Sequence, residues 1–334
     1  MKVLAMVLAG GAGTRLHPLT SDNAKPAVPF AYGFRIVDFV LSNLVNSEIS
    51  NIYLLAQYKP RSLIKHIESA WAVPSHGPSN SIKVVLPQAD KPGGHFRGTA
   101  DAVLQNIELI RQHAPDLVAV FAADHIYRMD VRQMIAFHQA RRADVTVAAV
   151  PVPIEAATSF GVITTEASSA IRRFEEKPAA PAPTPMDPTR AFASMGNYLF
   201  NPGVLIELLE EAALRGGTDF GHDIMPRLPG YARAYAYDFT DNRVPGVAEN
   251  EEHAYWRDVG TLDALSAARN DVSRSRPLFN LWNRRWPIRG HGHSTLVSHL
   301  NDWKNRSRIS DRELSAPYRI AALARETPAR EFSP

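Results

Sequence analysis

The stretch that decides the fold is VLAMVLAGGAGTR, residues 3–15. Its first half is a short apolar run of the kind that forms a buried β-strand, and its second half is a glycine-rich turn. A secretory leader would end such a run in a cleavage site rather than in a turn of this kind. Glycines let a backbone approach phosphate oxygens closely, and successive N–H groups can bind them. The stretch therefore predicts the first strand of an α/β sheet with a ligand loop at its carboxyl end.

More apolar runs follow and alternate with amphipathic segments. We expect strands at 52–56, 82–86, 117–122, 145–150, 192–200 and 232–239. We expect helices at 38–45, 99–112, 130–141 and 203–214, and Asp38 is interpreted as the capping residue of the first of these. This alternation predicts a Rossmann-like α/β fold, with a mixed, mostly parallel sheet and helices on both faces.

Composition excludes several classes of protein. The chain has 334 residues, of which 45% are hydrophobic and 21% charged, as in soluble globular proteins. It has no cysteine, which excludes disulfides and thiolate chemistry and suits the cytoplasm. No apolar run approaches the roughly 20 residues that span a bilayer, so no membrane association is expected.

Charge is uneven along the chain. The net charge is +3, but from Arg274 onward there are 12 basic and 5 acidic residues. Nucleic-acid binding is the less favoured interpretation of this basic end, because it has no recognition module. A solvated or disordered extension is favoured instead. We place a catalytic domain at 1–275 and a basic extension at 276–334.

The loop and the segment after it carry candidate phosphate ligands. The spacing of the glycines in the loop fits neither the Walker sequence nor the dinucleotide fingerprint, and a tight turn without a ligand remains an alternative. Arg15 adds a bidentate positive charge, and Lys25 follows in a segment whose backbone is restricted by proline.

Acidic residues supply the candidate metal ligands. Asp124 stands where an apolar run ends, and Asp258 lies in the segment 255–261. Two carboxylates plus substrate phosphates would form an oxygen-rich Mg²⁺ site, although Asp124 could instead be a turn cap. His125 is interpreted as a structural neighbour. Glu176 and Lys177 are candidates for sugar hydroxyls and a sugar phosphate, or else an ordinary surface charge pair.

Together these segments resemble the bacterial glucose-1-phosphate adenylyltransferases, or ADP-glucose pyrophosphorylases, of the sugar nucleotidyltransferase family. The resemblance runs from about Val3 to Arg289 and includes the segments 34–43, 97–103, 193–196, 219–224, 255–261 and 283–289. It implies a GT-A-like nucleotidyltransferase fold. It also implies attack of glucose 1-phosphate on the α-phosphorus of ATP, giving ADP-glucose and pyrophosphate for glycogen synthesis, without a covalent intermediate.

The resemblance also implies roles for particular residues. Those implied to be catalytic are Arg15, Lys25, Asp124 and Lys177, with Asp124 and Asp258 holding Mg²⁺. Those implied to bind ATP are Gly10, Gly11, Gly13, Thr14, Arg15, Gln88, Gly98 and Thr99. Those implied to bind glucose 1-phosphate are Phe96, Gly161, Glu176, Lys177 and Ser194; Phe96 stands where the family usually has tyrosine.

The end of the chain departs from the family. Residues 290–334 match neither the family nor a hexapeptide repeat, so we expect the C-terminal left-handed β-helix to be absent. The resemblance implies a homotetramer, but the β-helix supplies much of the family's subunit contact, and the tetramer is not carried over. Two alternatives stay open: a non-catalytic partner of an intact paralogue, and the same chemistry with another nucleotide.

Overall fold

The computed structural model describes residues 1–71, 81–88 and 94–291. Its strands are β1 Val3–Ala9, β2 Asn51–Ala56, β3 Ser81–Val85, β4 Leu117–Ala122, β5 His125–Tyr127, β6 Val145–Pro153, β7 Gly161–Thr165, β8 Ile171–Glu176, β9 Arg190–Phe200, β10 Ala234–Asp238 and β11 Trp256–Asp258. Its α-helices are α1 Val37–Asn46, α2 Pro60–Ala70, α3 Thr99–Leu104, α4 Ile107–His113, α5 Val131–Ala140, α6 Pro202–Leu214 and α7 Leu262–Ser273.

Nine of the strands in the described residues form one mixed sheet. Its main path is β10-β6-β9-β4-β1-β2-β3, and β7 pairs with both β8 and β9. β1 runs parallel to β2 and to β4, whereas β9 is antiparallel to its neighbours β4 and β6. The predicted α/β fold is confirmed. No β-helix occurs in residues 1–71, 81–88 and 94–291, and most of the stretch 290–334 lies outside them.

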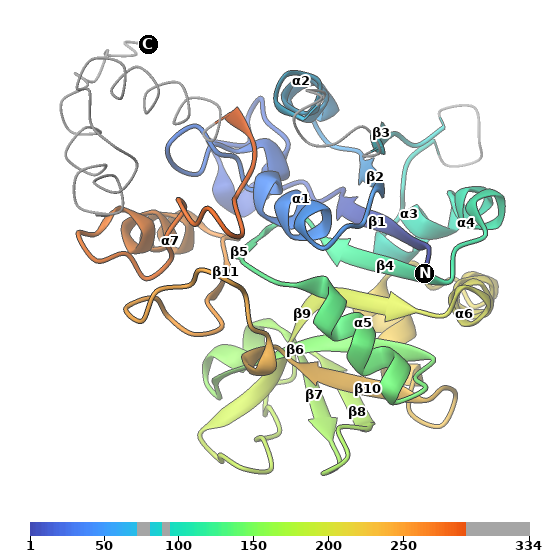
Figure 1. Ribbon diagram of the computed structural model, residues 1–334. Coiled ribbons are helices and arrows are strands. Elements are labelled where there is room, and N and C mark those ends of the chain that lie inside the picture. Colours follow the sequence, from blue (N-terminus) through green and yellow to red (C-terminus); the bar gives the residue numbers. More distant parts are fainter. Residues whose placement is uncertain (72–80, 89–93, 292–334) are drawn as a thin grey trace, which may run out of the picture.

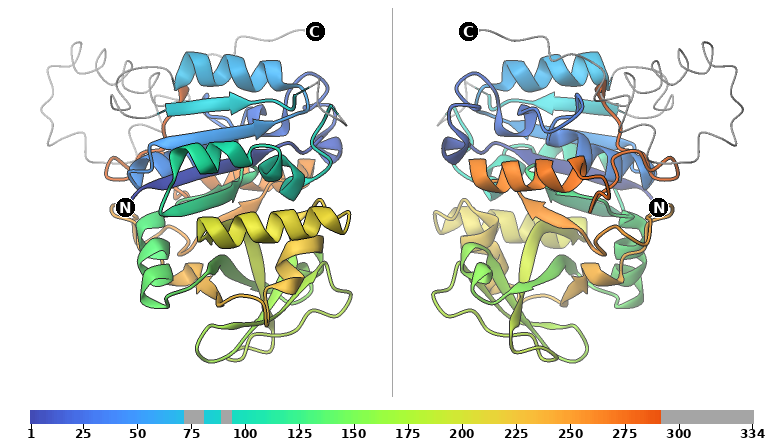
Figure 2. Two further views of the ribbon diagram at one scale, coloured as in Figure 1. Left: turned by 90° about the vertical axis from the view of Figure 1, so that its right-hand side faces the viewer. Right: turned by 90° about the vertical axis from the view of Figure 1, so that its left-hand side faces the viewer.

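Two hydrophobic clusters cover the two faces of this sheet. Side chains alternate along β1, so Ala5 and Val7 join a cluster with α1, α2 and α5, while Leu4 and Met6 join one with α3, α4 and α6. Figure 1 shows α1 and α5 on the same side of the sheet, and the left panel of Figure 2 looks onto α6. Because β1 is buried on both faces, its sequence is an unbroken apolar run.

The predicted helix 99–112 is wrong as one element, because the structure divides it into α3 and α4. The side-chain amide of Asn106 donates to the carbonyl oxygen of Ala102 at 2.9 Å, and the Asn106 backbone has φ −113° and ψ 20°. A short polar side chain that bonds a nearby backbone carbonyl competes with the helical hydrogen bonds, and the spacing of apolar residues does not reveal this competition.

The predicted capping role of Asp38 is also wrong. Ile36 is the N-terminal capping residue of α1, and it makes no side-chain capping bond. Asp38 lies inside the helix and is fully buried. Its carboxylate accepts hydrogen bonds from the Arg35 N–H at 2.8 Å and the Trp71 indole N–H at 2.8 Å, and it lies 2.6 Å from Nε2 of His66. Asp38 therefore joins α1 to α2 instead of starting α1.

Candidate active site

The glycine loop after β1 packs directly against Lys25. Gly13 has φ +67°, a left-handed conformation that favours glycine, and a Cβ added there would lie 3.0 Å from Cβ of Lys25. The Thr20 hydroxyl closes the loop by donating to the Gly13 carbonyl oxygen at 2.9 Å. Gly11, Thr14 and the side chain of Arg15 remain exposed on this loop. The glycine loop and Lys25, which were predicted as separate phosphate ligands, are therefore in contact with each other.

The Lys25 ammonium lies between two carboxylates. Its Nζ is 2.7 Å from Oδ2 of Asp124 and 4.0 Å from Oδ1 of Asp258. Asp124 lies two residues after the end of β4, and Asp258 is the last residue of β11, which pairs with β5 (Figure 1). Only 10% of the Lys25 side chain is exposed, against 34% of Asp124. The structure therefore brings three of the predicted site residues together.

Opposing effects act on the pKa of Asp124. Burial alone would raise it, but the neighbouring His125 and Lys25 lower it by more, so this pKa lies well below its usual range. The Asp124 carboxyl is consequently ionised at neutral pH.

The same carboxylates have the chemistry of a divalent-cation site. Asp124, His125 and Asp258 each place one ligand atom within 4.8 Å of the others, the one such group in the described part of the chain. Carboxylate oxygens are the ligands that Mg²⁺ prefers, so the donor set fits this ion. The His125 ring packs on Trp256 with 4.9 Å between centroids, and its interpretation as a structural neighbour stays a prediction.

Arg15 reaches the same place from the glycine loop. A Cβ added at Gly260 would lie 3.1 Å from a guanidinium nitrogen of Arg15 and 3.1 Å from Oδ1 of Asp258. Gly260 thus leaves room for both charged groups. Two cations and two carboxylates converge at the carboxyl ends of β1 and β4, where open α/β sheets bind their ligands.

The loop that carries Gly98 and Thr99, two residues implied to bind ATP and called the nucleotide loop below, is joined by hydrogen bonds to a second segment of the chain. The Thr99 hydroxyl donates to Oδ2 of Asp219 at 2.8 Å and accepts from the Phe220 N–H at 2.9 Å. Gly98 lies so close to Thr218 that an added Cβ would be 2.4 Å from its carbonyl oxygen.

The predicted sugar residues lie on the far side of that segment. Oε2 of Glu176 would be 3.0 Å from a Cβ added at Gly161 and 2.6 Å from one added at Gly221. Glu176 also lies 2.7 Å from the Lys177 ammonium. Lys177 has φ 49°, an uncommon conformation for a non-glycine residue that clusters at functional sites. Asp219 bonds the Gly221 N–H at 2.8 Å and thereby links this group to Thr99.

A chain of ring contacts connects the sugar residues to the carboxylates. Phe160 packs on Trp256 at 5.3 Å between ring centroids, and its carbonyl oxygen accepts from the Lys177 N–H at 3.0 Å. Trp256 in turn packs on His125, next to Asp124. Ser194 lies on β9 opposite Ala149 of β6, and its role in sugar binding stays a prediction.

Two further predicted residues flank the nucleotide loop. Gln88 is exposed beyond β3, beside residues outside the described ones, and its role stays a prediction. Phe96 is buried, and the side-chain amide of Gln57 contacts its backbone twice, donating to its carbonyl oxygen at 3.2 Å and accepting from its N–H. Gln57 was not predicted. It directly follows β2, so the rule that singled out Asp124 after β4 could have found it.

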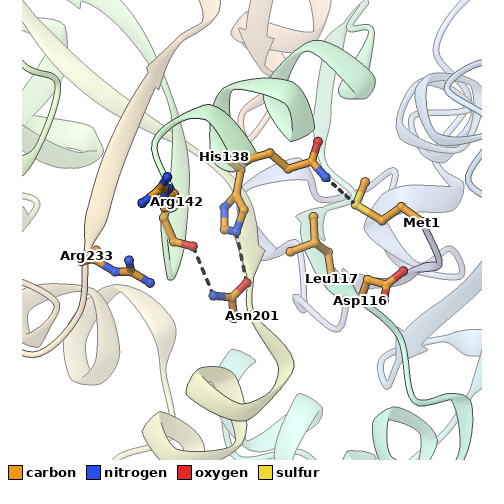
Figure 3. Close-up of a pocket in the computed structure, with 9 residues that line it drawn as sticks. Met1, Asp116, Leu117, His138, Arg142, Asn201 and Arg233 are labelled. Atoms are coloured by element: carbon orange, nitrogen blue, oxygen red, sulfur yellow. Dashed lines mark hydrogen bonds between the residues drawn. The ribbon is translucent and has the colours of Figure 1, made fainter.

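A cavity of about 280 Å³ lies at the opposite, amino ends of the strands (Figure 3). Its lining residues include Met1 and Asp116, which precede β1 and β4, and Ala143, which precedes β6. His138 is buried in its wall and lies 3.3 Å from Oδ1 of Asn201. This cavity is therefore separate from the charged cluster at the carboxyl ends.

A glycine loop with converging cations and carboxylates at the carboxyl edge of a mixed α/β sheet defines a protein that handles phosphate groups. The chain belongs to the nucleotidyl transferase family: the profile described as "Nucleotidyl transferase" matches residues 4–275.

Within this family, the chain is similar to several proteins that share one name. The glucose-1-phosphate adenylyltransferase of Thermodesulfovibrio yellowstonii is 53% identical over 288 residues, covering 86% of this chain and 70% of that protein. Proteins of the same name from Mycobacterium leprae and Mycobacterium tuberculosis are each 49% identical, and the matches cover 86% of this chain and 72% and 71% of those proteins. No helix in the described residues has the length and apolar character needed to cross a membrane.

Proposed function

We propose that this enzyme transfers the adenylyl group of ATP to α-D-glucose 1-phosphate, giving ADP-glucose and pyrophosphate for glycogen synthesis. The observation that carries the proposal is the Lys25 ammonium held between Asp124 and Asp258 beside the glycine loop, in a chain about half identical to proteins of that name.

The reaction is an in-line displacement at the α-phosphorus. An oxygen of the sugar phosphate forms the new P–O bond while the bond to pyrophosphate breaks. No protein nucleophile takes part, so the side chains act by positioning the reactants and neutralising their charge. Arg15, Lys25 and the N–H groups of residues 10–14 bind the polyphosphate of ATP, and these are the groups that Gly13 and Gly260 allow to approach one another.

Asp124 and Asp258 would hold Mg²⁺ in this proposal. Bound Mg²⁺ neutralises phosphate oxygens and helps to align the two reactants. The placement of both carboxylates at one site supports this assignment, because carboxylate oxygens are the ligands that Mg²⁺ prefers.

The nucleotide and the sugar bind on either side of Asp219. Gly98, Thr99 and Gln88 line the nucleotide side, and Gln57 fixes the loop that leads to them. On the sugar side Glu176 accepts hydrogen bonds from hydroxyls, Lys177 pairs with the sugar phosphate, and Phe96, Gly161 and Ser194 complete the contacts. The cysteine-free composition supports the further proposal that the enzyme works in the cytoplasm.

The test is pyrophosphate release from purified protein with Mg²⁺, glucose 1-phosphate and each nucleoside triphosphate in turn. Asp124→Asn is the site variant. Asp116→Asn, which changes an exposed carboxylate at the other end of β4, is the matched control. We expect release with ATP, loss in Asp124→Asn and retention in Asp116→Asn. Release with a different nucleotide and not with ATP would show that the enzyme uses that nucleotide instead. No release with any nucleotide from folded protein would favour the alternative that this chain is a non-catalytic partner of an intact paralogue.

A further inference from the structure

The contacts of Lys25 have a consequence for metal binding. The ammonium contacts the carboxylate oxygens that a divalent cation would use, at 2.7 Å from Asp124 and 4.0 Å from Asp258. Mg²⁺ sits about 2.1 Å from its oxygen ligands, so ion and ammonium compete for the same oxygens. The Lys25 side chain is 90% buried, and it has little freedom to move into water.

The charges around the carboxylates already balance. Asp124 and Asp258 supply two negative charges, and Lys25 and Arg15 supply two positive ones, to which His125, 3.5 Å from Oδ1 of Asp124, adds positive charge when it is protonated. A divalent cation that enters alone therefore adds two uncompensated positive charges next to Lys25. A divalent cation that enters with a nucleoside triphosphate brings the negative charge that balances it, and the phosphates give Lys25 a new partner.

We propose that Lys25 is the counter-ion of Asp124 and Asp258 in the nucleotide-free protein, excludes divalent cations from them, and transfers to the phosphates when nucleotide binds. Metal and nucleotide then bind cooperatively, each strengthening the other by the same factor. The nucleotide half of this inference rests on the proposed function, whereas the exclusion of metal alone does not.

The metal half is tested with Mn²⁺ alone, by measuring free Mn²⁺ with electron paramagnetic resonance. Lys25→Gln removes the ammonium, and Lys25→Met is the second variant should Gln disturb folding. Lys83→Gln removes the charge of an exposed lysine on the edge strand β3 and controls for net charge. Each change is repeated in an Asp124→Asn background, which removes a carboxylate of the site.

We expect Lys25→Gln to bind Mn²⁺ alone at least tenfold more tightly than the unmodified protein and Lys83→Gln to match the unmodified protein. Asp124→Asn should cancel the gain. Unchanged or weaker Mn²⁺ binding in folded Lys25→Gln and Lys25→Met would overturn the proposal, and so would a gain that persists in the Asp124→Asn background.

The nucleotide half is tested by repeating the titration with ATP. We expect ATP to tighten Mn²⁺ binding at least tenfold more in the unmodified protein than in Lys25→Gln, and an equal effect in both would overturn the transfer of Lys25. If no nucleoside triphosphate binds the unmodified protein, the proposed function fails, while the titration with Mn²⁺ alone still decides whether Lys25 excludes the metal.

Discussion

Gly98 is the position where a single added methyl group has the most calculable effect. Its φ of −176° is open to any residue, so space and not backbone strain limits substitution. A Cβ there would lie 2.4 Å from the carbonyl oxygen of Thr218 and 2.9 Å from its hydroxyl oxygen, closer than real Cβ contacts. In Gly98→Ala the Thr218 backbone therefore has to move by about half an ångström or more.

That movement disturbs two hydrogen bonds. The Thr218 carbonyl oxygen accepts from the Ala100 N–H at 2.8 Å and from the Asp101 N–H at 3.0 Å. Each net bond is worth about 0.5–1.5 kcal/mol, so we expect Gly98→Ala to lose about 1–3 kcal/mol of unfolding free energy. The neighbouring Thr99–Asp219 bond moves with Thr218, and we expect kcat/KM for ATP to fall by about tenfold or more.

Urea unfolding measures the first effect and pyrophosphate release the second. Gly203→Ala is the matched control, because a Cβ added there meets nothing within 4 Å and α6 gains a better helix former. The control should keep full activity and gain up to about 1 kcal/mol. A Gly98→Ala protein as stable and as active as the unmodified one would refute the link between the close approach at Thr218 and the nucleotide loop.

Three other changes have expected outcomes. Asp38→Ala leaves His66 and the Trp71 indole without their buried acceptor, so urea unfolding should show a loss of about 3–5 kcal/mol; a loss below 1 kcal/mol would contradict this. Burial lowers the pKa of His138, so the unfolded chain takes up a proton at this residue more readily than the folded chain does, and stability falls as pH drops below about 6.5. Between pH 7.5 and pH 5.5 the unfolding free energy should therefore fall less in His138→Gln than in the unmodified protein. An equal fall in both proteins would count against this role of His138. Phe96→Tyr restores the hydroxyl usual in the family, so the Michaelis constant for glucose 1-phosphate should fall by up to about tenfold. An unchanged Michaelis constant would rule out a role for that hydroxyl.

The strands were predictable because a strand buried on both faces must be apolar throughout. The run 117–122 is β4 to the residue, and the predicted strand 52–56 differs from β2 only at its first residue. Helices whose polar face dominates gave no such signal. α2 was not predicted: it buries Leu63, His66, Ile67 and Ala70, but its 11 residues also carry arginine, lysine, histidine and glutamate, so its sequence resembles a charged surface segment. A strand that is buried on both faces is recognised from its composition alone, whereas a helix that buries one narrow face among charged residues is easily missed.

Site residues were predictable where they directly follow a strand, and harder to find where distant segments meet. Asp124 is indicated by the end of an apolar run. Asp219 has no such signal, because its partner Thr99 becomes a neighbour only when the loop before α3 meets the loop after α6. The resemblance singled out the segment 219–224 without giving Asp219 a role, and the hydrogen bonds on both of its oxygens supply that role.

A third hydrophobic cluster explains how the phosphate-side residues are held. Each of the four charged residues stands within three positions of a member of this cluster: Leu16 beside Arg15, Val28 after Lys25, Ile126 after Asp124 and Val259 beside Asp258. A side chain that follows a buried neighbour inherits the rigidity of the packed core, which a surface loop alone does not supply.

The same cluster extends past the predicted domain boundary at 275, which stays a prediction. Phe279, Leu281 and Ile288 are buried in it, and the Phe279 ring lies 5.9 Å from that of Phe39 in α1. From α7, Arg269 donates hydrogen bonds to the carbonyl oxygens of Pro29 and Phe30, a few residues after Lys25. Residues 279–288 thus pack into the core that positions the reacting charges. They form no helix or strand, so no periodicity in the sequence marks them, and the signals that tie them to the catalytic unit are their irregularly spaced apolar side chains and the family resemblance, which runs to Arg289.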